Sequence, residues 1–206
     1  MPYNMWFVTT AEQSLPAKEW IKYVAELRDD LRAELTAGAP ESWEEITVKG
    51  PDGWWWFNFM RYSAGGDGGR WSDDLEFFQS WLAVGKPEVN ARWAEEYLTR
   101  VRTVYKFKCS TSAPEANMDV VNDIVRRLRD DDSSGLLYAE LEGWINDRGA
   151  HITWGFSDQV AGGCLMAIRR PGEWVYFRME LGVPEHREAF QTGVAPIGLE
   201  ALTIPD

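Results

Sequence analysis

Apolar side chains recur every three or four residues over several stretches of this chain, a period typical of helices with one buried face. After a short predicted strand at residues 5–10, the period begins near Ser14, a predicted N-cap, and continues to Gly38. It returns over residues 75–82, 89–104, 118–128 and 184–190. The apolar positions of the first stretch are Trp20, Val24, Leu27, Leu31 and Leu35. These stretches predict helices that pack one face against a core.

In two other stretches, apolar and polar residues alternate on either side of a turn that contains proline and glycine. This pattern predicts two β-hairpins. Residues 45–49 and 54–61 flank Pro51-Asp52-Gly53, and residues 164–169 and 174–181 flank Pro171-Gly172, at a constant offset of 120. Proline presets φ at such a corner and glycine permits a positive φ. Further strands are predicted at 103–109 and 136–139, with a third hairpin over 144–154.

Together these elements predict an α+β fold in a single globular domain of residues 1–206, a mostly antiparallel sheet with helices packed on one face. The two hairpins, and a helix match at an offset of 101, suggest two pseudo-repeated strand-helix-hairpin-helix halves. These halves would be 1–103 and 104–190, followed by an irregular tail at 191–206. The alternative is that amphipathic helices and Pro-Gly hairpins resemble one another by convergence. The matching helix residues are Val24, Leu27, Arg28, Asp29 and Asp30, against Val125, Leu128, Arg129, Asp130 and Asp131.

The net charge of −12 narrows the range of partners. It repels nucleic-acid phosphates and anionic membranes, so neither is a predicted partner. The charge suits a basic protein partner, and equally a plain role in solubility. No run of 18 apolar residues and no leader-like N-terminus is present in the sequence, which predicts a cytoplasmic protein. Cys109 and Cys164 have no metal-ligand spacing, so we expect reduced thiols, no metal and no cofactor.

Twelve tryptophans suggest an aromatic surface, because indole rings serve protein interfaces and sugar platforms as well as cores. Successive strand side chains point to opposite sides. One face of the second hairpin strands is predicted to be core: Trp55, Phe57 and Phe59, with Val175, Phe177 and Met179. The other face supplies the candidate binding residues Trp54, Trp56, Trp174 and Tyr176. The alternative is that a loop or helix covers this face.

Carboxylates supply the remaining candidates: Asp130, Asp131, Asp132, Glu140 and Glu142. The aspartates end a predicted helix, where they oppose the helix dipole, and they do not form an EF-hand loop. Glu140 and Glu142 lie two apart, so on a strand both carboxylates would share a face, an arrangement open to paired-carboxylate chemistry. Residues 63–70 are rich in glycine and end at Arg70. This composition favours a surface loop over an anion-binding site.

The leading functional hypothesis is a non-enzymatic acidic domain that binds a basic protein, of the immunity or regulatory type. The alternative is a small-molecule enzyme or carbohydrate-binding module with an aromatic cleft between the two halves, including His151 and Glu140 or Glu142. A third hypothesis is self-association through the ribbon edges. His151 and His186 belong to no catalytic motif, so no catalytic residue is assigned.

Overall fold

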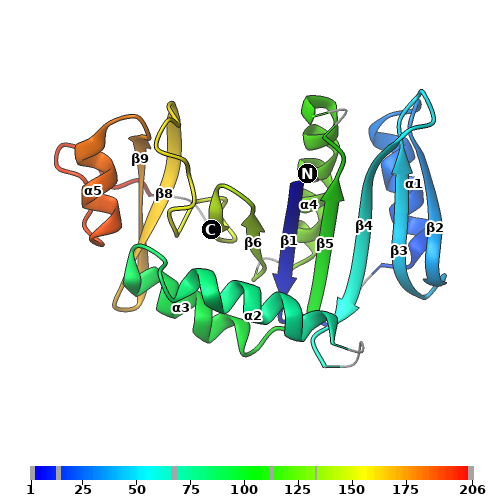
Figure 1. Cartoon of the computed structure of the whole chain (residues 1–206), viewed down its shortest axis with the longest axis horizontal. Helices are drawn as coiled ribbons and strands as arrows, with labels where there is room; N and C mark the ends of the chain where they lie inside the picture. Colours follow the sequence, from blue (N-terminus) through cyan, green and yellow to red (C-terminus); the bar gives the residue numbers. More distant parts are fainter. Residues whose placement is uncertain (1–2, 13–14, 66–68, 112–113, 133, 204–206) are drawn as a thin grey trace. The chain divides into compact units, whose positions relative to one another are not determined.

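The structure is a computed structural model that describes residues 3–12, 15–65, 69–111, 114–132 and 134–203 (Figure 1). The chain forms two compact units. Unit 1 takes Met1–Trp71 and Val101–Gly135, and unit 2 takes Ser72–Arg100 and Leu136–Asp206. Helices and antiparallel strands occur in both, which confirms the α+β class.

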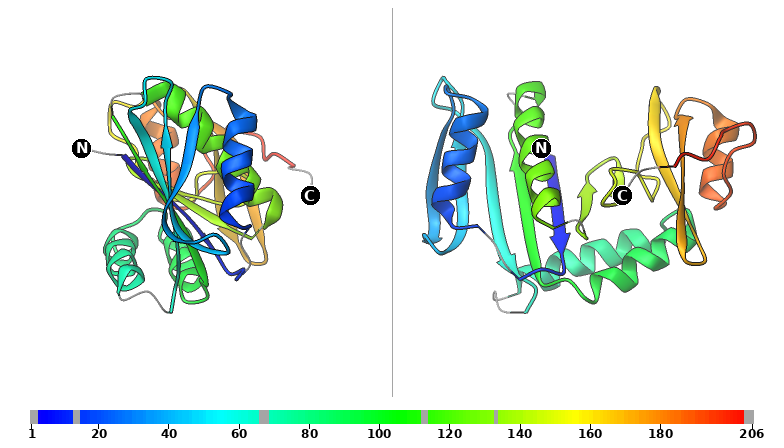
Figure 2. Two further views of the ribbon diagram at one scale, coloured as in Figure 1. Left: turned by 90° about the vertical axis from the view of Figure 1, so that its right-hand side faces the viewer. Right: turned by 180° about the vertical axis from the view of Figure 1, so that it is seen from behind.

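Unit 1 is an antiparallel sheet with two helices on one face. Its described strands run in the order β2-β3-β4-β5-β1. The helices α1 and α4 lie on the same side of these strands (Figure 2), and the Tyr23 hydroxyl of α1 donates to the Asp123 carbonyl of α4 at 3.3 Å. The strands are β1 (Tyr3–Thr9), β2 (Arg32–Ala39), β3 (Ser42–Lys49), β4 (Trp55–Ser63) and β5 (Thr103–Cys109), and the helices are α1 (Ala17–Leu27) and α4 (Pro114–Asp131).

The core of unit 1 follows from the strand register. Ile46 pairs with Phe59, Phe59 with Phe107, and Phe107 with Met5, so four neighbouring strands place apolar side chains on one face. The Phe59 and Phe107 rings stack at 4.8 Å, and Trp20 of α1 meets Phe59 edge-on at 5.2 Å. Helix α1 therefore buries its apolar face on the centre of this sheet.

The prediction of one helix reaching Gly38 is wrong, because α1 ends at Leu27 and β2 begins at Arg32. Arg28 is already extended, with φ −155°. Leu31 and Leu35 lie four residues apart, a spacing that keeps two side chains on one face of a helix and also on one face of a strand. The proposed cap Ser14 lies outside the described residues.

Three other helix boundaries differ from prediction. Helix α3 (Glu88–Leu98) ends six residues before the predicted end at residue 104. Asn117 lies inside α4 instead of capping it. Helix α2 (Arg70–Leu82) begins two residues before the predicted cap at Ser72. Short strands were placed more accurately, and β5 and β6 match the predicted ranges 103–109 and 136–139.

Unit 2 combines helices with two hairpins. Phe78 of α2 packs on Tyr138 and Trp144 of the first hairpin, at 5.3 and 4.9 Å. A second core lies around Phe177 and Phe190. The elements are α2 from Ser72 on, α3, α5 (Pro184–Gln191), and the hairpins β6 (Leu136–Ala139) with β7 (Gly143–Ile145) and β8 (Gly163–Arg170) with β9 (Glu173–Glu180).

The two predicted Pro-Gly hairpins are both present, as β3–β4 and β8–β9. Gly53 and Gly172 have φ of 78° and 86°, the conformation for which glycine was expected. The pseudo-repeat is not confirmed. The compact units interleave along the chain and do not coincide with 1–103 and 104–190, and the register of the first hairpin shifts where that of the second does not.

Candidate functional site

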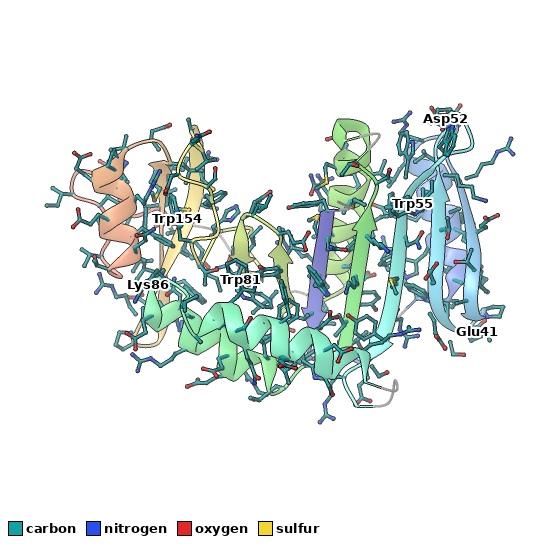
Figure 3. All side chains as sticks on the ribbon, viewed as in Figure 1. Glu41, Asp52, Trp55, Trp81, Lys86 and Trp154 are labelled. Atoms are coloured by element: carbon teal, nitrogen blue, oxygen red, sulfur yellow. The ribbon has the colours of Figure 1, made fainter. Side chains whose placement is uncertain are left out.

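Trp54, a predicted binding residue, stands exposed at the tip of the β3–β4 hairpin, with 74% of its surface accessible. Its backbone is fixed there. Its N–H donates to Asp52 Oδ1 at 3.0 Å, and its carbonyl accepts from Gly50 N at 2.9 Å. Asp52 marks this tip in Figure 3. The turn thus holds a large indole in solvent beside a carboxylate.

The prediction that Trp56 lies on the same strand face as Trp54 is wrong, because β4 contains a β-bulge. Val48 pairs with Phe57 and Lys49 pairs with Trp55, so Trp56 is the extra residue between the two pairs. An extra residue reverses the alternation of side chains on its strand. Trp56 is therefore buried, at 6% exposure, and Trp55 is turned to the polar face.

Both indoles have defined neighbours. Trp56 lies against Gly50, where a Cβ would come within 2.0 Å of its Nε1, and the Arg28 guanidinium lies 5.0 Å from its ring. Trp55, half-buried, donates its indole N–H to Asn58 Oδ1. Trp55 was predicted to be core, and its position on the polar face is the second consequence of the bulge. Figure 3 labels Trp55 on β4.

The three aspartates at the end of α4, Asp130, Asp131 and Asp132, have different surroundings. Asp132 accepts a hydrogen bond from Thr9 Oγ1, which ties this segment to β1. Asp131 lies 3.5 Å from Arg127 one turn earlier. Asp130 is exposed. Asp132, the aspartate just beyond the helix, thus has a structural partner, which the sequence did not indicate.

Glu140 and Glu142 lie in the turn between β6 and β7, so they do not share a strand face as paired-carboxylate chemistry would require. The Glu142 N–H donates to the Ala139 carbonyl at 3.1 Å. Between the two glutamates, Leu141 has a positive φ of 67° and is 77% exposed. The turn therefore presents an apolar side chain between two carboxylates, and sequence reasoning missed Leu141 as a candidate.

Trp174 and Tyr176 share one face of β9, and both are half-buried. Trp174 meets Trp93 of α3 edge-on at 4.9 Å. The Tyr176 hydroxyl accepts from Asn146 Nδ2 at 3.4 Å. Burial, followed by the Asp147 carboxylate, raises the pKa of Tyr176. Unit 2 itself thus partly covers both rings.

The loop around Arg70 gives no support to an anion site. Residues 66–68 lie outside the described part of the chain, and Arg70 lies 3.7 Å from the Glu44 carboxylate.

One cluster in unit 2 resembles the acid/base set of the enzyme hypothesis. His151, 8% exposed, has its Nε2 3.9 Å from Glu142 Oε2. The backbone N–H of His151 donates to the Leu165 carbonyl on β8, next to Cys164. Burial, followed by the Glu142 charge, raises the pKa of the Cys164 thiol to about 11. A nucleophilic cysteine needs a lowered pKa, and the raised pKa of Cys164 instead favours the neutral thiol.

Cys164 is accordingly expected to react slowly with a thiol reagent. At pH 8 the thiolate fraction is small, and modification of the folded protein should be roughly a hundredfold slower than that of free cysteine. The rate should rise with pH up to about 11, the pKa of Cys164. Stopped-flow absorbance with a disulfide reagent measures this, with Cys164→Ser as the control that leaves the buried Cys109. Rapid modification at pH 7 would instead identify an activated thiol.

The described residues contain no group of three or more His, Cys, Asp or Glu side chains arranged to hold a metal ion. None of the helices in that part of the chain has the length and apolar character needed to cross a membrane.

No family model, curated protein or solved structure matches this chain.

Proposed function

We propose that this chain is a non-enzymatic protein-binding domain that engages a basic partner, as an immunity-type or regulatory protein would. Leu141 carries the proposal. It is an apolar residue, 77% exposed, at a positive φ of 67° between Glu140 and Glu142. A partner that buries Leu141 and brings lysine or arginine near the two glutamates would contact all three side chains of this turn at once.

The conformation of Leu141 makes its exposure informative. A left-handed backbone costs a residue with a Cβ about 1–2 kcal/mol relative to the right-handed region. Glycine takes this conformation without that penalty, and Asn or Asp adopts it more readily than leucine does. Leucine therefore lowers stability at this position without burying its side chain. Such strained residues cluster at functional sites.

Trp54 supports the proposal in unit 1. Tryptophan is a frequent anchor in protein interfaces, and here its backbone is already fixed by the hairpin tip. Little backbone entropy is lost when such a residue binds. The net charge of −12 adds long-range attraction for a basic protein, which accelerates association at low salt.

The variant Leu141→Gly separates function from stability. It is expected to raise the free energy of unfolding by up to about 1 kcal/mol, because glycine relieves the left-handed strain. It should also weaken partner binding, because the apolar contact is lost. Denaturant unfolding measures the first effect, and surface plasmon resonance with the captured partner measures the second.

Trp54→Ala is the second variant, expected to weaken binding by about 2 kcal/mol or more with little change in stability. Ile197→Ala serves as control, since Ile197 is 99% exposed in unit 2 and has no role in the proposal. The association rate should fall with rising salt. A partner that binds both variants as tightly as the native protein, or an acidic partner, would refute the proposal.

A further inference from the structure

A groove in unit 2 is lined by cations, although the unit is acidic overall. Its walls are the start of α3, the tip of the β8–β9 hairpin and the end of α5, and its volume is about 750 Å³. Unit 2 contains eight lysines and arginines beside 16 aspartates and glutamates. Four of those eight cations line this groove: Lys86, Arg92, Arg169 and Arg170. Figure 3 labels Lys86, just before α3.

Three of the four cations have no carboxylate partner among the described residues. Lys86 and Arg170 are exposed, and Arg169 lies 5.4 Å from the Trp174 ring. Only Arg92 is paired, with Glu88 at 2.9 Å. Beside Glu88, the groove is lined by one further carboxylate, that of Glu188. Positive charge therefore exceeds negative charge within the groove.

A buried hydrogen-bond network holds the walls together. Asn90 of α3, fully buried, donates to the carbonyls of Ile152 and Ala167 at 2.7 and 2.8 Å. Its Oδ1 accepts from the Arg169 N–H at 2.8 Å. This network fixes the backbone of Arg169 against α3, so the cations project from a preformed backbone frame.

A second lobe, about 400 Å³, continues from the first and shares Arg92, Arg169 and Arg170 with it. It adds the indole of Trp93 and the carboxylate of Glu96. Trp93 is held edge-on against Trp174. An indole offers a surface for a planar ring, and a carboxylate accepts from ring N–H groups or ribose hydroxyls.

We propose that this groove binds a nucleoside phosphate. The phosphate lies among Arg92, Arg169 and Arg170, where guanidinium groups match its oxygens. The base or ribose occupies the lobe with Trp93 and Glu96. Inorganic phosphate would use only the first part of the site, and a plain nucleoside only the second. The proposal is independent of the protein-binding role.

Isothermal titration calorimetry of the full chain with AMP, adenosine and inorganic phosphate tests it. AMP should bind more tightly than either fragment. Arg170→Glu should weaken AMP binding by about tenfold or more, because it removes a charge-assisted contact and adds repulsion. Arg178→Glu is the matched control, the same charge change at an exposed residue of β9 that does not line the groove. It should weaken AMP binding by less than about threefold.

Trp93→Leu should reduce the preference for AMP over inorganic phosphate and leave phosphate affinity unchanged, with thermal melting confirming that the variant is folded. Four results would overturn the proposal. These are no binding of AMP at millimolar concentration, equal affinity for AMP and adenosine, equal affinity for AMP and inorganic phosphate, and equal losses from Arg170→Glu and Arg178→Glu. The last would indicate a diffuse charge effect instead of a site.

Discussion

Asn90→Ala is expected to lower the free energy of unfolding by about 3–5 kcal/mol, the largest effect of a single side chain that we predict. Asn90 is fully buried in unit 2 and makes three hydrogen bonds to backbone groups of Ile152, Ala167 and Arg169. Its removal takes the side-chain partner from two carbonyls and one N–H inside unit 2, and each buried group left unsatisfied costs about 1–3 kcal/mol. Denaturant unfolding followed by tryptophan fluorescence measures the loss.

Asn90→Asp refines this prediction. The carboxylate can still accept from the Arg169 N–H but cannot donate to the two carbonyls, and it buries a negative charge beside them. The loss of stability is measured against the native protein at the same pH. It should be larger at pH 7 than at a pH low enough to protonate the new carboxylate. Asn122→Ala, an exposed substitution in α4, is the control and should change stability by less than about 0.5 kcal/mol. A small loss for Asn90→Ala would mean that water replaces the amide.

Gly135→Ala is expected to destabilise the protein by about 2–3 kcal/mol through overpacking. A Cβ at Gly135 would come within 1.9 Å of Phe7 Cζ. Phe7 is fully buried in β1, so its ring cannot turn into solvent. The strand or the following segment would have to shift. Thermal or denaturant unfolding measures the loss.

A double-mutant cycle decides whether Phe7 is the cause. Phe7→Leu removes ring atoms at the point of contact, so Gly135→Ala should cost clearly less in the Phe7→Leu background than in the native one. Gly65→Ala is the control, because a Cβ there would meet nothing within 4 Å. Equal costs in both backgrounds would assign the loss to the backbone of residue 135 instead.

The hairpins were predictable because their signals are local. Pro51-Asp52-Gly53 and Pro171-Gly172 define turns within a few residues, and the positive φ of Gly53 and Gly172 agrees. The end of α1 was less predictable. Leu27, Leu31 and Leu35 satisfy helical and strand periods alike, and only pairing of β2 with β3 resolves the choice.

The candidate binding residues show the same limit. Trp54 is exposed as hypothesised, whereas the bulge at Trp56 depends on the register between β3 and β4. A residue's face is set by pairing, and pairing is not local. Leu141 carried only a weak signal, a leucine between two glutamates before a glycine. The four cations of the groove lie up to 84 residues apart, and only folding brings them together.

The sequence by itself determined the α+β class, the two Pro-Gly hairpins and the acidic character of the protein. Turn chemistry and short-range periodicity depend on neighbouring residues, and net charge is a sum over all residues of the chain. The tertiary structure alone decided which indole is buried at the bulge, that Leu141 stands strained in solvent, and that cations gather in one groove of an acidic unit. These features depend on strand register and on contacts between segments distant in the chain, and so no local pattern encodes them.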